Sequence, residues 1–340
     1  MREGAMLSDL YASVAAYRRR WYEQHPESRR RLTQPVISVG ALGVGGCGKT
    51  PVAGLIAELL RDAGEHPAIL SRGYGREDRT DGVVVVRDRG AVLATVTTAG
   101  DEPLMLAERL PGVCVLVSDD RYVAGRLAET RLGATVHVLD DGFQHLPLAR
   151  DIDLLLTHAD DLDQKTLPSG RLRERPDTAQ RADAVIVDTA DRKAAVAVAD
   201  RLGLKAVFRL ERALGPPQLV GLATSSVAVP NDARVLAVAG IAMPNRFVEA
   251  LTATGYDVVD FLAFKDHHRF TSVDITCIAD SARYANVEWV MVTEKDAVRL
   301  APYVPLPFQL VSVPLTVRIE PAGEFNSWLL TRLTHEGTFR

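Results

Sequence analysis

A glycine-rich turn between an apolar strand and a helix constrains the fold of this chain more than any other feature. The turn consists of Gly43, Val44, Gly45, Gly46, Cys47, Gly48, Lys49 and Thr50. Glycines let backbone N–H groups wrap around a phosphate, and the start of the following helix adds more N–H groups. Lys49 is placed to reach the β- and γ-phosphates of a nucleotide, and Thr50 to hold Mg²⁺ through its hydroxyl. The pattern is that of a P-loop and predicts binding of nucleotide phosphates.

The residues on both sides of the turn predict an α/β fold. Strands are expected at 36–39, 67–70, 113–117, 135–139, 152–156 and 184–187, a hairpin from 83–86 and 92–96, and a helix over 51–60. Short apolar strands that alternate with helical patterns are typical of parallel sheets. We therefore expect a P-loop NTPase-like, doubly wound and mostly parallel sheet.

A change in character near residue 205 predicts a second, smaller α/β domain. Further strands are expected at 234–239, 258–264, 289–292 and 308–311, with helices between them. This divides the chain into an N-terminal amphipathic helix (1–30), a P-loop domain (31–205) and a smaller C-terminal α/β domain (206–340).

Composition excludes some classes of function. The chain has 340 residues, a net charge of −4 and a pI near 6.1, whereas a general nucleic-acid binder would carry a basic footprint. Its three cysteines, Cys47, Cys114 and Cys277, are widely spaced and form no CxxC pair. We therefore expect no nucleic-acid partner and a reducing, cytoplasmic setting.

The N-terminal segment has an apolar stripe with basic flanks. Leu7, Leu10, Tyr11, Val14, Tyr17 and Trp21 recur at helical spacing, and arginines cluster at 18–20 and 29–31. Such a helix can lie in a lipid interface, with its arginines on anionic headgroups. It can equally be packed on its own domain with a solvated basic face. The stripe is too short to span a bilayer.

Two acidic pairs are candidates for chemistry. Asp140 and Asp141 end a buried strand, where a P-loop protein needs a carboxylate beside Thr50 for Mg²⁺. Asp101 and Glu102 follow Gly100 at the start of a predicted helix. They are either an acidic first helical turn or the source of a general base beside the γ-phosphate.

Three other segments leave alternatives open. The loop 167–174 carries Arg171 and Arg173, which could neutralise a transferring phosphoryl group or be surface charges. In the run 265–270, two adjacent histidines could suggest a metal site, although one histidine paired with a carboxylate across a cleft is more economical. The run 293–296 does not match the Asn-Lys-x-Asp order that reads guanine, so GTP is not favoured.

Taken together, these segments resemble one family, the tetraacyldisaccharide 4'-kinases of lipid A biosynthesis. The matching segments are 43–51, 71–75, 100–103, 140–145, 167–174, 266–267 and 293–298, in order and over nearly the whole chain. The resemblance implies transfer of the γ-phosphate of ATP to the 4'-hydroxyl of tetraacyldisaccharide 1-phosphate, which gives lipid IVA. It also implies peripheral contact with the membrane at the cytoplasmic face of the bacterial inner membrane.

The resemblance also implies roles for single residues. Asp101 matches the catalytic carboxylate and His267 the histidine that pairs with it, which favours the general-base interpretation. The expected phosphate and metal residues are Lys49 and Thr50 in the P-loop, Asp140, Asp141 and Glu174 on the metal side, and Arg121, Arg171 and Arg173 as phosphate contacts. The chain departs from the usual family pattern at Ala41 and Arg171. Two alternatives remain: a P-loop kinase for another glycolipid or small molecule, and a P-loop NTPase switch without a lipid acceptor.

Overall fold

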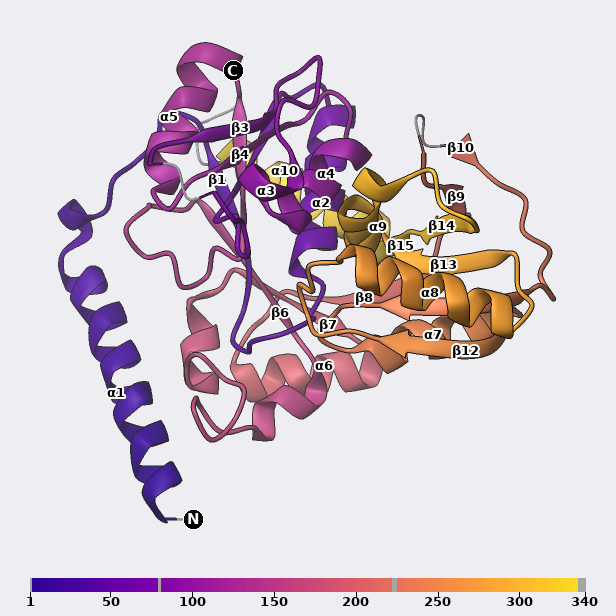
Figure 1. The fold of residues 1–340 in the computed structure, drawn as a ribbon. Coiled ribbons are helices and arrows are strands. Elements are labelled where there is room, and N and C mark those ends of the chain that lie inside the picture. The colour runs from indigo at the N-terminus through magenta and orange to yellow at the C-terminus, as the bar shows by residue number, and fades with distance from the viewer. Residues whose placement is uncertain (1, 79–80, 222–224, 336–340) are drawn as a thin grey trace.

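Two sheets, each covered by helices, make up the computed structural model of the chain (Figure 1). The structure describes residues 2–78, 81–221 and 225–335. The ends of the predicted first and last segments, residue 1 and residues 336–340, lie outside this range. The larger sheet has nine strands in the order β15-β8-β7-β6-β1-β5-β2-β4-β3, and the smaller has six in the order β10-β9-β14-β13-β11-β12.

The large sheet is parallel except at its two edges. Its strands are β1 (Val36–Ala41), β2 (Pro67–Ser71), β3 (Val84–Arg87), β4 (Cys114–Val117), β5 (Val136–Asp140), β6 (Ile152–Thr157), β7 (Ala184–Asp188), β8 (Val207–Leu214) and β15 (Leu315–Glu320). Only β3 and β15 run antiparallel to their neighbours. Every residue of β1 is buried, as expected for a central strand with helices on both faces. The loops that follow the parallel strands therefore meet at one edge of the sheet.

Helices cover both faces of this sheet. They are α2 (Lys49–Asp62), α3 (Val96–Ala99), α4 (Asp101–Arg109), α5 (Arg121–Leu132), α6 (Arg192–Leu202) and α10 (Ala322–His335). Apolar side chains of α2, α4 and α10 form one core with the sheet. The opposite face packs against α5 and α6 in two further clusters. In α2 the inward positions Val52, Ile56 and Leu60 recur at helical spacing and are fully buried.

The small sheet forms a second α/β layer structure. Its strands are β9 (Gln218–Leu219), β10 (Ser225–Ser226), β11 (Arg234–Ala239), β12 (Asp257–Ala263), β13 (Trp289–Thr293) and β14 (Gln309–Val313). One face packs on α7 (Pro244–Thr254), and the other on α8 (Ser272–Tyr284) and α9 (Glu294–Leu300). The short 3₁₀ helices of the chain are η1 (Pro26–Ser28), η2 (Ala159–Asp163), η3 (Pro176–Arg181) and η4 (Ala301–Tyr303).

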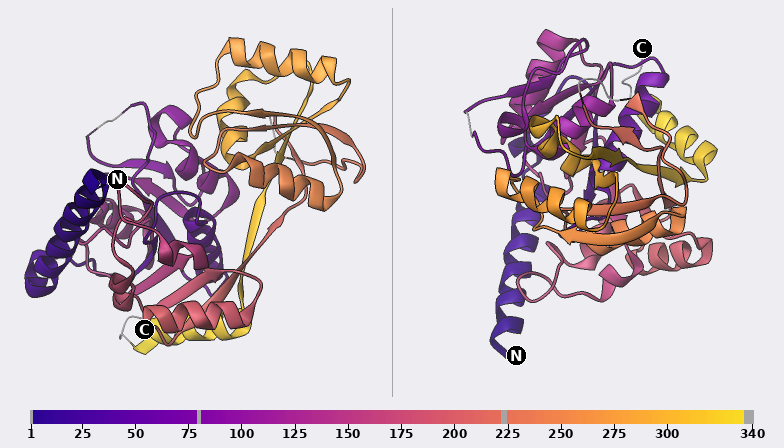
Figure 2. Two further views of the ribbon diagram at one scale, coloured as in Figure 1. Left: turned by 90° about the horizontal axis from the view of Figure 1, so that it is seen from below. Right: turned by 45° about the vertical axis from the view of Figure 1, so that its right-hand side comes forward.

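A pair of antiparallel strands connects the two α/β units. β8 leads from the large sheet toward the small one, and β15 returns beside it, with Leu214 opposite Leu315 and Arg209 opposite Glu320. The left view of Figure 2 shows these two strands running side by side between the units. The sheets thus do not divide at residue 205, because β8 and β15 both belong to the large sheet. Independent folding of the predicted segments 31–205 and 206–340 stays a prediction.

The predicted hairpin at 83–96 forms only near its turn. β3 pairs with β4, Val92 forms an antiparallel bridge to Arg87, and the N–H of Leu93 donates to the carbonyl of Val86, but no strand extends over 92–96. Val96 begins the short helix α3 instead, because Thr95 and Thr98 cap each other across its first turn.

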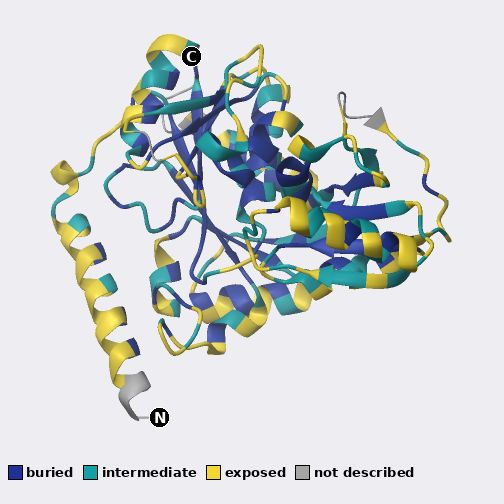
Figure 3. Cartoon of the chain, viewed as in Figure 1, coloured by how far each residue is buried: buried dark blue, intermediate teal, exposed yellow. Residues whose placement is uncertain are grey.

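The N-terminal helix α1 (Arg2–Gln24) lies at the periphery of the large unit (Figure 1). Ser8, Ala12 and Arg19 are buried against the body of the protein. Most of the remaining surface of α1 is exposed, as the yellow face in Figure 3 shows. Among the residues that the structure describes, no helix is both long and apolar enough to cross a bilayer.

Candidate active site

The glycine-rich turn after β1 has the backbone shape of a phosphate-binding loop. Gly45 and Gly48 have φ of +98° and +84°, values that glycine adopts without a steric penalty. Gly48 is also the N-cap of α2. The free N–H groups of the first turn of α2 therefore lie at the loop, where they can bind an anion.

Thr50 and Asp140 meet beside this loop, as the sequence predicted. The Thr50 hydroxyl lies 3.1 Å from Oδ2 of Asp140, and both side chains are buried. Burial, together with the nearby charges of Glu102 and Asp141, raises the pKa of Asp140 to about 7. The site thus concentrates negative charge in a region shielded from water.

Asp141 lies next to this pair and interacts with two cations. Its carboxylate is 3.5 Å from Nζ of Lys49 and 2.7 Å from Nη1 of Arg173. Burial acts to raise the pKa of Asp141, but the charges of Lys49 and Arg173 outweigh it and lower the pKa. The ion pair with Asp141 therefore fixes the position of the Lys49 side chain, at the point where the loop enters α2.

The residues around Thr50 fit a magnesium ion that is shared with a nucleotide. Within 2–78, 81–221 and 225–335, no group of three or more His, Cys, Asp or Glu side chains is arranged to hold a metal. Mg²⁺ in nucleotide sites usually takes one or two protein oxygens and completes its shell with phosphates and water. The hydroxyl of Thr50 and the carboxylate of Asp140 supply such oxygens, and a cation there would offset the charge that raises the pKa of Asp140.

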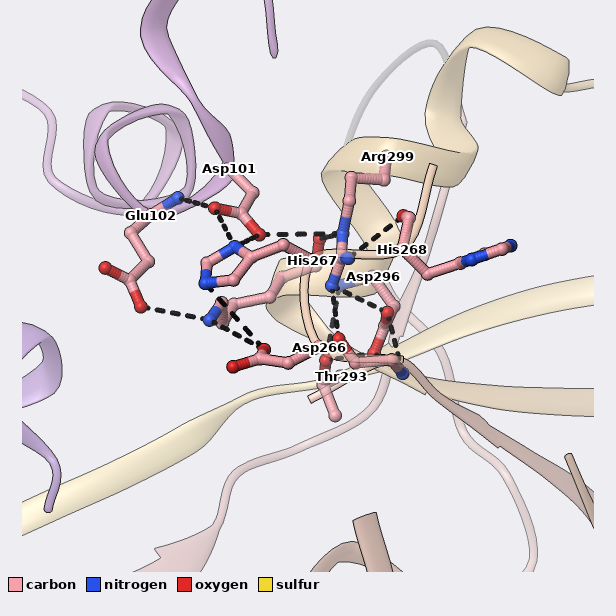
Figure 4. Close-up of polar contacts among 10 residues, drawn as sticks. Asp101, Glu102, Asp266, His267, His268, Thr293, Asp296 and Arg299 are labelled. Atoms are coloured by element: carbon pink, nitrogen blue, oxygen red, sulfur yellow. Dashed lines mark hydrogen bonds and ion pairs between the residues drawn. The ribbon is translucent and has the colours of Figure 1, made fainter. Parts of the chain in front are cut away.

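Asp101 and His267 come from different α/β units and are in contact. Asp101 is the first residue of α4, and His267 lies in the loop between β12 and α8. Nδ1 of His267 is 2.9 Å from Oδ2 and 3.1 Å from Oδ1 of Asp101 (Figure 4). The carboxylate also accepts the N–H of Glu102, at 2.9 Å. Asp101 is 4% exposed, so its charge depends on these partners.

The pKa directions favour an ion pair between these two residues. Burial acts to raise the pKa of Asp101, but the hydrogen bond from His267 and the charges of Lys295 and Arg299 lower it. The hydrogen bond to Asp101 raises the pKa of His267 against the effect of burial. The backbone of His267 has φ of +57°, which costs a non-glycine residue energy. Such strain is common at functional sites.

A network of charged residues from α9 supports this pair (Figure 4). Arg299 donates to Oδ1 of Asp296 at 2.8 Å and to the carbonyl of Gly240 at 3.0 Å, and its Nε lies 3.6 Å from Asp101. Asp296 is fully buried and also accepts from Thr293 at 2.6 Å. The turn that carries His267 is tied to this network, because the N–H of His267 donates to the carbonyl of Gly240.

A second ion pair joins the two units next to the Asp101–His267 pair. Nζ of Lys295 lies 2.9 Å from Oε1 of Glu102 and 3.8 Å from Oδ1 of Asp266. The charge of Glu102 also helps to raise the pKa of Asp140, so the two sides of the site act on each other electrostatically.

Arg121 is buried at the start of α5 with a poorly compensated charge. Its Nη1 lies 3.4 Å from Nδ1 of His145, and among the described residues no carboxylate forms an ion pair with it. Burial, followed by the charge of Arg72, lowers the pKa of Arg121, and Asp141 and Asp140 offset this in part. An anion bound beside Arg121 would be stabilised.

Arg171 lies against the phosphate-binding loop, and Glu174 is paired with a residue of α1. Arg171 donates from Nη2 to the carbonyl of Val44 at 3.0 Å, so it contacts the backbone of the loop. Glu174 accepts two hydrogen bonds from Arg19 of α1, at 2.9 and 2.7 Å. Arg19 thus neutralises and holds this buried carboxylate, and the role of Glu174 on the metal side stays a prediction.

Several residues of this site have no role predicted from the sequence. Lys295 and Asp296 lie in the run 293–298, which was noted only for its resemblance and for its lack of a guanine motif, and Arg299 follows that run directly. A signal was present, since four charged residues lie within residues 294–299 beside the apolar strand β13. Buried charges are rare unless they are paired.

The fold and site define a P-loop phosphotransferase built from two α/β units. Comparison with known families agrees with this class of protein. The family model described as tetraacyldisaccharide-1-P 4'-kinase matches residues 4–334. The chain belongs to this family, and the family, fold class and enzyme class predicted from the sequence are confirmed.

Named relatives and a solved structure are similar over most of their length. A tetraacyldisaccharide 4'-kinase of Syntrophus aciditrophicus is 36% identical, over 96% of this chain and 91% of that protein. One of Anaeromyxobacter dehalogenans is 40% identical, over 86% and 79%. The crystal structure of LpxK from Aquifex aeolicus in complex with ATP has a TM-score of 0.78 and 30% identity, and the match covers 96% of this chain and 97% of that chain.

Proposed function

We propose that this chain transfers the γ-phosphate of ATP to the 4'-hydroxyl of tetraacyldisaccharide 1-phosphate, with Asp101 and His267 as its acid–base pair. One observation carries the assignment of residues. The buried carboxylate of Asp101 lies at the start of α4, next in the chain to Glu102, whose charge acts on Asp140, and it is held by a histidine from the other unit. A carboxylate placed so can take the proton of a hydroxyl that attacks the γ-phosphate.

The loop 43–50 would bind and orient the nucleotide. Its N–H groups and the start of α2 would hold the phosphates, and Lys49 would exchange its contact with Asp141 for the β- and γ-phosphates. Thr50 and Asp140, with Asp141 close by, would hold Mg²⁺, which offsets charge on the phosphates when bound. These contacts position the phosphoryl group, and the protein contributes little covalent chemistry.

Asp101 would act as the base, and His267 would orient it. The lowered pKa of Asp101 keeps the carboxylate ionised at neutral pH, so it can accept the hydroxyl proton at an oxygen. His267 holds the carboxylate from the second unit and balances its charge. Arg121 would contact an anionic group of the substrate or of the transferring phosphoryl, because its buried charge otherwise lacks a carboxylate partner among the described residues.

We also propose that α1 contacts the cytoplasmic face of the bacterial inner membrane. Its apolar side chains Met6, Leu7, Leu10, Val14 and Tyr17 are all more than half exposed. The opposite side of α1 is fixed to the protein, since Arg19 binds Glu174, and Thr166 donates to the carbonyl of Ser8. The helix is thus both packed on its own unit and open to a lipid surface. A lipid substrate with four acyl chains would be reached from such a surface.

Transfer of labelled γ-phosphate tests this function. The enzyme is mixed with labelled ATP and tetraacyldisaccharide 1-phosphate in detergent micelles, and labelled lipid is separated from free phosphate. We expect labelled lipid with the native chain and none with Lys49→Ala. Release of phosphate to water without labelled lipid would reject the acceptor and favour the NTPase alternative. Transfer only to a different glycolipid would favour the other-substrate alternative.

A further inference from the structure

Arg212 contacts the backbone of the phosphate-binding loop. It lies on β8, and its Nη1 and Nη2 are 3.4 and 3.5 Å from the carbonyl oxygen of Gly46. A Cβ atom added to Gly48 would lie 3.1 Å from Nη2 of Arg212. The guanidinium thus occupies the space beside Gly48 that a side chain would take. The turn itself favours glycine here, because φ of Gly48 is +84°.

Arg212 contacts a carbonyl group of the loop, whereas phosphate would be bound by its N–H groups. A phosphate-binding loop turns its N–H groups toward the anion, and its carbonyls therefore point outward. Arg212 donates to one such carbonyl, that of Gly46, and Arg171 donates to another, that of Val44. The two arginines thus hold the loop at carbonyls on either side of Gly45.

A fixed carboxylate orients the guanidinium of Arg212. Its Nη2 lies 2.8 Å from Oδ2 of Asp188, the last residue of β7. The same oxygen of Asp188 is 3.1 Å from Nδ1 of His158. Both side chains of the Arg212–Asp188 pair are about one-fifth exposed, at 21% and 18%. A partly buried, charge-assisted contact of this kind is stronger than a surface ion pair.

The position of Arg212 along β8 connects the loop to the strands between the two units. The pairing of β7 with β8 ends at Asp188 opposite Leu210, two residues before Arg212. From there β8 is paired only with β15, and Arg212 lies opposite Val317. The same strand pair leads to the unit that supplies His267 (Figure 2).

We propose that Arg212 is a positioning residue that fixes the phosphate-binding loop to the strand pair joining the two units. Arg212 keeps the loop in the conformation that binds nucleotide phosphates. It also fixes the position of the loop relative to β8 and β15, the strands that join the large unit to the unit that carries His267. This inference rests on the proposed use of the loop for ATP, but it does not depend on the identity of the lipid acceptor.

Nucleotide binding by the variant Arg212→Gln tests the proposal. A hydrogen bond to a charged group contributes enough to change a dissociation constant about tenfold. We expect the dissociation constants for ATP and for ADP to rise together by about that factor, because both need the loop. KM for ATP should rise similarly, and the midpoint of thermal unfolding should stay close to that of the native chain.

Arg209→Gln is a matched control on the opposite face of the same strand. Arg209 contacts the carbonyl of Ala190 and the carboxylate of Glu211, and it does not contact the loop. It should leave nucleotide binding unchanged. Arg212→Lys keeps the positive charge but loses the planar guanidinium that can donate two hydrogen bonds at once. Its dissociation constants for nucleotide should lie between those of the native chain and Arg212→Gln. If Arg212→Gln unfolds, Arg212→Lys and Asp188→Asn still test the contact, and both should weaken binding.

Two results would overturn the proposal. Equal nucleotide binding in Arg212→Gln and Arg209→Gln would mean that the contact with Gly46 has no role. Weaker ATP binding with unchanged ADP binding would mean that Arg212 contacts the γ-phosphate itself and does not act through the loop. Failure of the native chain to phosphorylate the lipid would reject the proposed acceptor. It would not change the conclusions drawn from nucleotide binding by the Arg212 and Arg209 variants.

Discussion

His267 binds Asp101 through Nδ1 at 2.9 Å, and this contact joins the loop after β12 to the start of α4. The two residues are 166 positions apart in the sequence. Each favours the charged form of the other, since the hydrogen bond lowers the pKa of Asp101 and raises the pKa of His267. Asp101 is therefore a candidate base whose ionised form is stabilised by His267 of the other unit. The strength of this ion pair depends on pH.

The stability that this pair contributes should be largest in mildly acidic solution. A lowered pKa of Asp101 adds stability above its ordinary value of 3.8, and this is lost as the pH falls through the folded pKa. A raised pKa of His267 adds stability below its ordinary value of 6.5, which is lost as the pH rises through the folded pKa. The full contribution is thus expected between 3.8 and 6.5.

Urea unfolding of His267→Asn at two pH values checks this. The loss of unfolding free energy relative to the native chain should be larger at about pH 6 than at about pH 9. His66→Asn, a change at an exposed histidine, should show no such difference. An equal loss for His267→Asn at both pH values would mean that the ion pair is absent.

Asp296→Ala should destabilise the small unit strongly. Asp296 is fully buried and is bonded to Arg299, Thr293 and the N–H of Gly240. Removing it leaves Arg299 buried without its closest carboxylate, and breaking such a pair costs about 3 to 5 kcal/mol. The measurement is the free energy of unfolding in urea. Asp280→Ala removes an exposed i,i+3 ion pair with Arg283 in the same unit and should cost less than about 1 kcal/mol. Similar costs for the two variants would show that the network is not structural.

Charges placed on the exposed stripe of α1 should release the protein from lipid. Leu10 and Tyr17 are 62% and 70% exposed, so Leu10→Asp and Tyr17→Asp should leave folding intact. Each loses the transfer free energy of an apolar side chain, which lowers vesicle binding by about tenfold or more. Co-sedimentation with vesicles that contain anionic lipid measures this. Val196→Asp, on an exposed position of α6, is the control. Unchanged sedimentation of the α1 variants would reject α1 as the membrane contact.

Local patterns in the sequence were enough to predict the centre of the fold and one side of the site. The apolar strand, the glycine turn and the helix at 36–60 lie within one short stretch. Asp140 could be placed because the carboxyl ends of parallel strands meet at one edge of a sheet. No comparison of distant segments was needed for these residues.

The rest of the site depends on contacts that local patterns do not encode. Glu174 forms an ion pair with Arg19, 155 positions away, and nothing near Glu174 in the sequence predicts that partner. Lys295 pairs with Glu102 across 193 positions, and Arg212 contacts the loop across 166. The pairing of β8 with β15 is equally remote in sequence. A charged residue gives no local sign of which distant partner will neutralise it.

The most direct test of the proposed mechanism is a double-mutant cycle on the Asp101–His267 pair. Transfer of labelled γ-phosphate to tetraacyldisaccharide 1-phosphate is measured for Asp101→Asn, His267→Asn and the double variant, with nucleotide binding measured in parallel. Each single change should lower kcat by roughly 10² to 10⁴, the range for a lost acid–base group. The double variant should be no slower than the slower single one, because the two residues act as a unit. Near-native turnover in Asp101→Asn, or losses that multiply in the double variant, would contradict the mechanism.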